Sequence, residues 1–256
     1  MIALGLGSGR TGTASLSYLI GSQKSAICFH ELNPTGAVFE GNPQPILNTI
    51  NEFQSILDGG DKRLLALDYS RPSSVTKYEE LKQMPEVNIM GDIAYYYLRY
   101  VEDILAINQQ VRFVCIKRDR AQTIASWMKK SAINRWLSLS IADRLKSIIT
   151  RTPYHESKNF WQQHDGTIWQ PDPVWDKTFP NFEASSKEDA IGKYWDYYYA
   201  EAERLATKHP GVFRIFPIEM MSDREGQANI LRFIGINEDE MVLRDKFHMH
   251  KSQKDD

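Results

Sequence analysis

Hydrophobic residues along the chain follow two alternating patterns. Short continuous apolar runs, which are typical of strands buried on both faces, occur at 2–4, 25–29, 87–91, 111–117 and 212–216. Between these runs, apolar residues recur every three or four positions and predict helices over 13–20, 46–57, 94–105, 121–130, 188–208 and 225–234. Strands that alternate with helices favour an α/β fold, in which helices cover both faces of a parallel sheet. Residues 63–69 fit either a strand or a continued helix, and periodicity does not decide between them.

The pattern changes between residues 131 and 187. This stretch is rich in tryptophan, histidine and proline, including Trp136, Trp161 and Trp169, and loses regular periodicity after Ile149. Disordered linkers contain few aromatic residues, whereas long irregular insertions in α/β domains commonly form lids or ligand-binding loops. We therefore expect residues 1–256 to form one domain, with 131–187 as a lid or acceptor-binding insertion.

A glycine-rich turn, Gly5 to Gly12, lies between the first predicted strand and the first predicted helix. Glycines let the backbone turn its N–H groups toward one point, and the start of a helix adds a partial positive charge there. Arg10 supplies a full charge, and Thr11, Thr13 and Ser15 are candidate hydroxyl donors. The stretch therefore predicts a cradle for a phosphate-like anion.

The spacing of the glycines leaves the kind of cradle open. Gly7 to Gly12 fits the first half of the Walker pattern, but Thr13 stands where the phosphate-binding lysine is expected. The dinucleotide pattern G-x-G-x-x-G also matches at Gly7, Gly9 and Gly12, and Glu31 follows at the spacing expected of the ribose-binding acid. Both readings stay open at this point.

A second candidate anion site follows the strand predicted at 111–117. Arg118 is expected to emerge at the carboxyl end of that strand, and Ser126 lies about two helical turns into the next element. A guanidinium and a hydroxyl in this arrangement suit a second phosphate. The alternative is that Arg118 pairs with a carboxylate and Ser126 faces the inside of its helix.

Three titratable residues follow predicted strands. His30 and Glu31 come at the end of 25–29, where open α/β sheets bind ligands, so both are candidate catalytic groups, although each alone is usually a solvated loop residue. Asp92 follows 87–91 and is read as the N-cap of the next helix in preference to a site residue.

Composition limits the classes of partner. The net charge of −2 gives no overall field for nucleic acid. Cys28 and Cys115 fall in apolar runs without a ligand-like cluster, which indicates buried reduced thiols in a cytoplasmic protein. The first strand begins at residue 2, so we expect no signal peptide, and no apolar stretch reaches the roughly 18 residues of a membrane span.

Taken together, the motifs resemble those of sulfotransferases. Gly5 to Leu16 resembles their 5′-phosphosulfate loop, above all the bacterial variants that read Gly-x-Gly-Arg-Thr-Gly-Thr-x-Ser-Leu. Lys117-Arg-Asp-Arg with Ser126 resembles their 3′-phosphate motif, and Tyr194 to Ile236 is similar to their C-terminal part. The resemblance spans most of the chain except 131–187, and it implies the P-loop-NTPase-like sulfotransferase fold.

The resemblance implies a donor and a reaction. The donor is 3′-phosphoadenosine 5′-phosphosulfate (PAPS), and its sulfuryl group passes in line and without metal to a hydroxyl or amine of a small-molecule or glycan acceptor, leaving 3′,5′-ADP. Arg118 and Ser126 would hold the 3′-phosphate, and the residues that would hold the 5′-phosphosulfate are Gly9, Arg10, Thr11, Gly12, Thr13 and Ala14.

The resemblance also implies catalytic roles. Arg10 stands where many relatives carry lysine and is assigned the stabilisation of charge on the leaving oxygen. Glu31 is assigned as the base, with His30 as its rival, because some bacterial relatives carry a catalytic glutamate after the corresponding strand. A P-loop kinase or nucleotide-binding protein is the alternative function and would require ATP with Mg²⁺. A nicotinamide-dependent oxidoreductase ranks last, because it leaves Arg118 and Ser126 without a role.

Overall fold

Within the residues that the structure describes, five parallel strands form one sheet in the order β2-β3-β1-β4-β5. The computed structural model describes residues 1–33, 43–69, 71–131, 145, 149 and 187–245. The strands are β1 (Ile2–Leu6), β2 (Ala26–His30), β3 (Ile89–Ile93), β4 (Arg112–Lys117) and β5 (Phe213–Pro217). All residues of β1 and β3 are buried, as expected for central strands covered on both faces. The prediction of an α/β fold built on a parallel sheet is confirmed.

The chain separates into two units, and each is described by itself. One unit contains Met1–Arg118 and Tyr199–Asp256 and holds the whole sheet. The other contains Asp119–Tyr198, with helix α5 (Arg120–Ser131) and the first part of α7 (Lys187–Lys208). Within this second unit, Arg120 forms an ion pair of 2.7 Å with Asp196. The insertion predicted at 131–187 lies outside the described residues except for its ends and residues 145 and 149.

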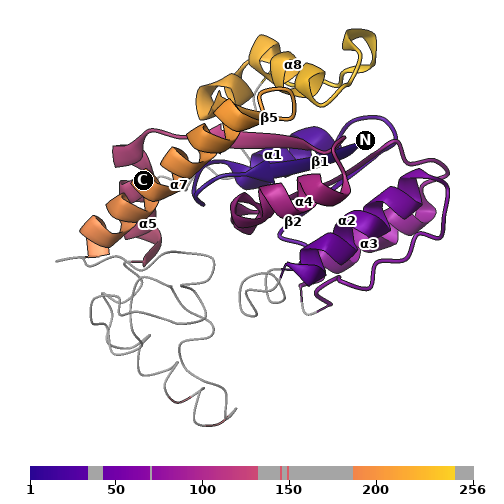
Figure 1. The fold of residues 1–256 in the computed structure, drawn as a ribbon, viewed down its shortest axis with the longest axis horizontal. Coiled ribbons are helices and arrows are strands. Elements are labelled where there is room, and N and C mark those ends of the chain that lie inside the picture. Colours follow the sequence, from indigo (N-terminus) through magenta and orange to yellow (C-terminus); the bar gives the residue numbers. More distant parts are fainter. Residues whose placement is uncertain (34–42, 70, 132–144, 146–148, 150–186, 246–256) are drawn as a thin grey trace. The chain divides into compact units, whose positions relative to one another are not determined.

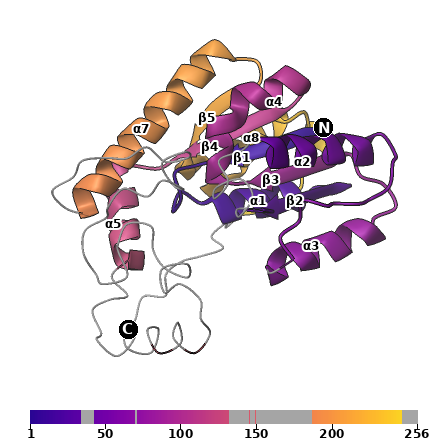
Figure 2. The same cartoon turned by 60° about the horizontal axis from the view of Figure 1, so that its bottom comes forward.

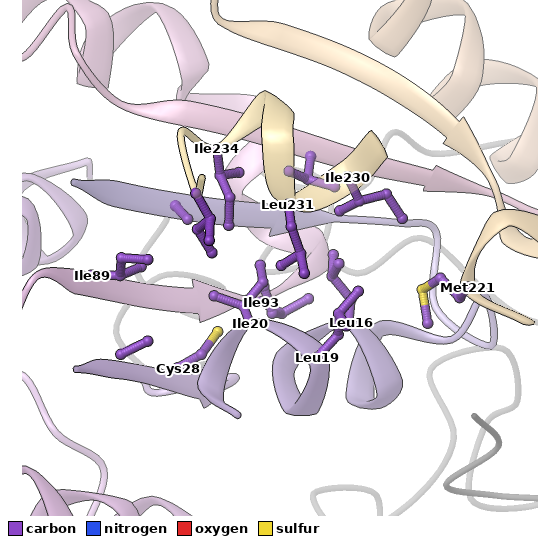
Figure 3. Close-up of a cluster of buried hydrophobic side chains, with 14 of the residues drawn as sticks. Leu16, Leu19, Ile20, Cys28, Ile89, Ile93, Met221, Ile230, Leu231 and Ile234 are labelled. Carbon is purple, nitrogen blue, oxygen red and sulfur yellow. The ribbon is translucent and has the colours of Figure 1, made fainter. Parts of the chain in front are cut away.

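One face of the sheet packs against α1 (Thr13–Gly21) and α8 (Arg224–Phe233), as Figure 3 shows. Leu16, Leu19 and Ile20 of α1 meet Ile230 and Leu231 of α8 in this buried cluster. Removing each of these side chains from water contributes about 1.5–3 kcal/mol. Because α1 directly follows the glycine-rich turn, this packing fixes the position of the helix start that the turn leads into.

The other face of the sheet is covered by α2 (Gln44–Leu57) and α4 (Val101–Ile107), which lie side by side in Figures 1 and 2. Phe53 of α2 stacks on Phe29 of β2 with ring centroids 6.3 Å apart. The helix α3 (Pro72–Gln83) packs beside β2, and short 3₁₀ helices η2 (Tyr95–Tyr100), η6 (Ile218–Ser222) and η7 (Glu238–Glu240) complete the described elements.

The structure corrects four local predictions. The segment predicted as one helix over 94–105 is the 3₁₀ helix η2 followed by α4, and residues 63–69 form no strand or helix. The strand predicted at 87–91 ends two residues later, at Ile93. Asp92 therefore lies inside β3 and is not the N-cap of the following helix, whose cap is Ala94.

Candidate functional site: a glycine loop with two arginines

The central strand β1 lies where the strand order switches from one side of the sheet to the other. The strands β3 and β2 lie on one side of β1, and β4 and β5 lie on the other. Open α/β sheets bind ligands outside the carboxyl ends of their strands at such a switch point. The glycine-rich loop that follows Leu6 starts there.

The loop between β1 and α1 is shaped by residues with positive φ. Gly9 and Gly12 have φ of 79° and 85°, and Arg10 adopts 59°, a left-handed conformation that is uncommon outside glycine. No side chain caps the start of α1, where Gly12 occupies the N-cap position. The first N–H groups of a helix lack intrahelical partners, so this end of α1 is suited to bind an anion.

The hydroxyl groups of Tyr199 and Ser8 connect the loop to the strand β4. The Tyr199 hydroxyl donates to the Ile116 carbonyl at 2.8 Å, and the Ser8 hydroxyl lies 3.5 Å from the Tyr199 oxygen. The side chain of Thr11 is fully buried, and a methyl group added to Gly7 would lie 2.2 Å from its Oγ1. The hydroxyl of Thr11 therefore faces the inside of the protein in this conformation.

Two guanidinium groups lie close together at the loop. Arg118 directly follows β4, the neighbour of β1, and its Nη1 donates to the Arg10 carbonyl at 3.1 Å. Partial burial lowers the pKa of Arg10, and the positive charge of Arg118 lowers that pKa further. Two arginines that meet at one loop favour a ligand with more than one negative charge. The preceding residue, Lys117, is turned to Glu203 at 2.7 Å.

His30 and Glu31 form a turn at the end of β2. The strand β2 does not lie next to β1, because β3 lies between them. The helix α1 nevertheless brings the turn to the loop, since Nε2 of His30 lies 3.1 Å from Oγ1 of Thr13. Glu31 has a φ of 55° and pairs with Arg71 at 3.0 Å. Sequence patterns gave no signal for Arg71, which is 40 residues away from Glu31.

The remaining predicted site residues divide into two groups. Ala14 lies in the first turn of α1, beside Thr13. Ser126 lies on α5 in the second unit, and its pairing with Arg118 stays a prediction.

Among the described residues, no group of three or more His, Cys, Asp and Glu side chains is arranged to hold a metal ion. In the same part of the chain, no helix combines the length and apolar character needed to span a membrane.

Comparison with known proteins supports the fold. No protein-family model and no curated protein matches the sequence. The structure resembles a sulfotransferase from Alicyclobacillus acidocaldarius with a TM-score of 0.51 and 12% identity, covering 97% of this chain and 85% of that protein. A sulfotransferase domain from the curacin biosynthetic pathway matches at a TM-score of 0.47 and 13% identity, over 93% of this chain and 74% of that domain. The chain has a sulfotransferase-like fold.

Proposed function

We propose that the protein transfers a sulfuryl group from PAPS to a hydroxyl or amine of a small-molecule or glycan acceptor. The observation that carries this proposal is the meeting of Arg10 and Arg118 at a glycine loop on the central strand. PAPS carries one anionic group at its 5′ end and another at its 3′ position. A site with two arginines and a helix start that no side chain caps matches a ligand of that kind.

The glycine loop would bind the 5′-phosphosulfate. Main-chain N–H groups of Gly9, Arg10, Thr11 and Gly12, with those of Thr13 and Ala14 at the start of α1, would surround its oxygens. Arg118, with Ser126 as its predicted partner, would hold the 3′-phosphate. Arg10 would stabilise the negative charge that develops on the bridging oxygen as the sulfur–oxygen bond breaks.

The reaction is an in-line substitution at sulfur. The acceptor oxygen or nitrogen forms a bond to sulfur, the bond from sulfur to the 5′-phosphate oxygen breaks, and 3′,5′-ADP leaves. A base takes the proton of the acceptor, and such a base contributes on the order of 10²–10⁴ in rate. Glu31 is the proposed base and His30 its rival, and both belong to the turn that reaches the loop through Thr13.

The identity of the residue after Gly12 separates this function from a kinase. Kinases and ATPases of the P-loop class use a lysine and Mg²⁺ on the β- and γ-phosphates. Thr13 stands in that position and its hydroxyl contacts His30. The sulfuryl group carries less charge than a γ-phosphate, so fixed donors and arginine are sufficient to neutralise it without a metal ion.

Binding and turnover assays test the proposal. Thermal shift with 3′,5′-ADP in EDTA should raise the melting temperature, whereas ATP with Mg²⁺ should raise it less. Release of 3′,5′-ADP from PAPS would then be measured with panels of phenols, alcohols, sugars and amines. Stabilisation by ATP with Mg²⁺ alone would favour the kinase and contradict the sulfotransferase assignment.

A further inference from the structure

A buried carboxyl group lies beside the turn that His30 and Glu31 form at the end of β2. Asp92, on β3, is fully buried although it carries an ionisable side chain. Carboxyl groups are seldom buried unless they are hydrogen-bonded, because loss of hydration costs several kcal/mol. Both Asp92 oxygens accept from the Leu32 N–H at 3.2 Å, and its Oδ2 also accepts from the hydroxyls of Tyr97 at 2.7 Å and Tyr96 at 3.2 Å.

The partners of Asp92 belong to the turn that carries the proposed base. Leu32 directly follows Glu31, whose backbone is left-handed. The turn is also held by the Glu31 N–H on the Ile93 carbonyl at 3.0 Å and by the Asp68 N–H on the Leu32 carbonyl at 3.1 Å. Because the Leu32 N–H points at the side chain of Asp92, replacing Asp92 by an apolar residue would leave a buried donor unsatisfied.

The two tyrosines fix the orientation of the carboxyl group. Burial raises the pKa of Tyr96 and of Tyr97, so both hydroxyls keep their protons and donate to Asp92. Burial also raises the pKa of Asp92, while the bonds from Tyr97 and Leu32 act in the opposite direction. With its rotamer held by η2, the carboxyl group is a fixed anchor for the Leu32 N–H.

We propose that Asp92 is a positioning residue, which holds the His30–Glu31 turn against the glycine loop so that the base faces the acceptor. This inference rests on the proposed function, since it assigns Asp92 to the proton-transfer side of that reaction. The donor side of the site depends on other contacts, from Arg118 to Arg10 and from Tyr199 to Ile116. Loss of Asp92 should therefore affect turnover and donor affinity unequally.

Three variants weaken the hydrogen bonds of Asp92 to different degrees. Asp92→Ala removes every acceptor, and a displaced base should lower kcat on the order of 10²-fold while the Kd of 3′,5′-ADP changes less than about threefold. Asp92→Asn keeps one carbonyl acceptor and should retain most of kcat. Tyr97→Phe removes only the 2.7 Å bond to Asp92 and serves as the milder variant if Asp92→Ala does not fold.

Gln23 provides a matched control. It is also a buried polar anchor, because its Nε2 donates to the carbonyls of Leu19 at 2.8 Å and Val242 at 3.0 Å, and its Oε1 accepts from the Val242 N–H at 2.8 Å. It follows the carboxyl end of α1, at the end of the helix away from the glycine loop. Gln23→Ala should lower the melting temperature about as much as Asp92→Ala with little change in kcat.

Amide exchange tests the inference without relying on activity. In Asp92→Ala the Leu32 amide should exchange at least about tenfold faster, and the ring signals of His30 should shift; neither should change in Gln23→Ala. Unchanged Leu32 exchange, or an equal kcat loss in both variants, would overturn the positioning role. Absence of PAPS turnover in the wild type would contradict the proposed function, and the exchange result would still decide whether Asp92 holds the turn.

Discussion

The guanidinium of Arg118 donates a 3.1 Å hydrogen bond to the main-chain carbonyl of Arg10, although 108 positions separate the two residues in the sequence. The contact arises because β1 and β4 are parallel neighbours, so the residues that follow them leave the sheet at the same edge. The Arg10 residue that accepts this bond has a left-handed backbone, with φ of 59°. This contact brings Arg118 to the glycine loop, where we propose that the two arginines and the loop bind one anionic ligand.

Gly7→Ala should disrupt this site. The added methyl group would lie 2.2 Å from Oγ1 of the buried Thr11, and overpacking of this kind typically costs about 1–3 kcal/mol. We expect a lower melting temperature and at least about tenfold weaker binding of 3′,5′-ADP in calorimetry. Gly211→Ala is the control, because nothing lies within 4 Å of its added methyl group. Equal affinity in the two variants would show that the loop tolerates the change.

Tyr199→Phe should destabilise the protein, because the Ile116 carbonyl loses the hydroxyl that donates to it. The variant removes the hydroxyl that donates to this carbonyl at 2.8 Å, and leaving a buried acceptor without its partner costs about 1–3 kcal/mol. Urea unfolding would measure the loss. Tyr197→Phe, at a residue that is 43% exposed, should stay within about 0.5 kcal/mol of the wild type. Similar losses in both variants would remove Tyr199 as a support of the loop.

Glu31→Gln should separate catalysis from donor binding. The substitution keeps the shape of the side chain and removes its basicity, so kcat should fall on the order of 10²–10⁴-fold while the Kd of 3′,5′-ADP stays nearly constant. His30→Asn is measured in parallel, and a large kcat loss there with an active Glu31→Gln variant would assign the base to His30.

Arg71→Gln distinguishes a base from a structural ion pair. Arg71 pairs with Glu31 at 3.0 Å, so a purely structural role for Glu31 would give Arg71→Gln and Glu31→Gln the same loss of kcat. If Glu31 is the base, Arg71→Gln should retain far more activity. Equal losses, with no further loss in the double variant, would mean that the ion pair alone matters.

The two cysteines should be unreactive in the folded protein. Both are buried, and burial raises the pKa of Cys28 and of Cys115, which suppresses the nucleophilic thiolate. Iodoacetamide at neutral pH should label neither residue until urea unfolds the chain, as measured by mass spectrometry. Fast labelling of either residue under native conditions would mean that its strand opens readily.

Local patterns in the sequence predicted much of this structure. The apolar run of β1 and the glycines after it identified the loop, and the spacing of Leu16, Leu19 and Ile20 identified the inner face of α1. The order of the strands could not be predicted from these patterns, because the placement of β3 between β1 and β2 depends on packing between distant segments.

Two contacts of the His30–Glu31 turn, with Asp92 and with Arg71, could not be predicted from the sequence. An acid near the end of an apolar run is ordinarily a helix cap, and only the non-local bond from Leu32, 60 residues away, reveals Asp92 as a buried anchor. The pairing of Arg71 with Glu31 likewise depends on how α3 packs beside β2, and no spacing in the sequence encodes it.

A thermodynamic cycle in calorimetry tests whether Arg118 binds the 3′-phosphate of the nucleotide. Wild type and Arg118→Ala would each be titrated with 3′,5′-ADP and with 5′-AMP, which lacks only the 3′-phosphate. A charged hydrogen bond contributes about 1.5–3 kcal/mol, so the wild type should prefer 3′,5′-ADP by on the order of 10–100-fold, and Arg118→Ala should lose that preference. Equal affinity of the wild type for the two nucleotides would contradict the binding of a 3′-phosphate by Arg118.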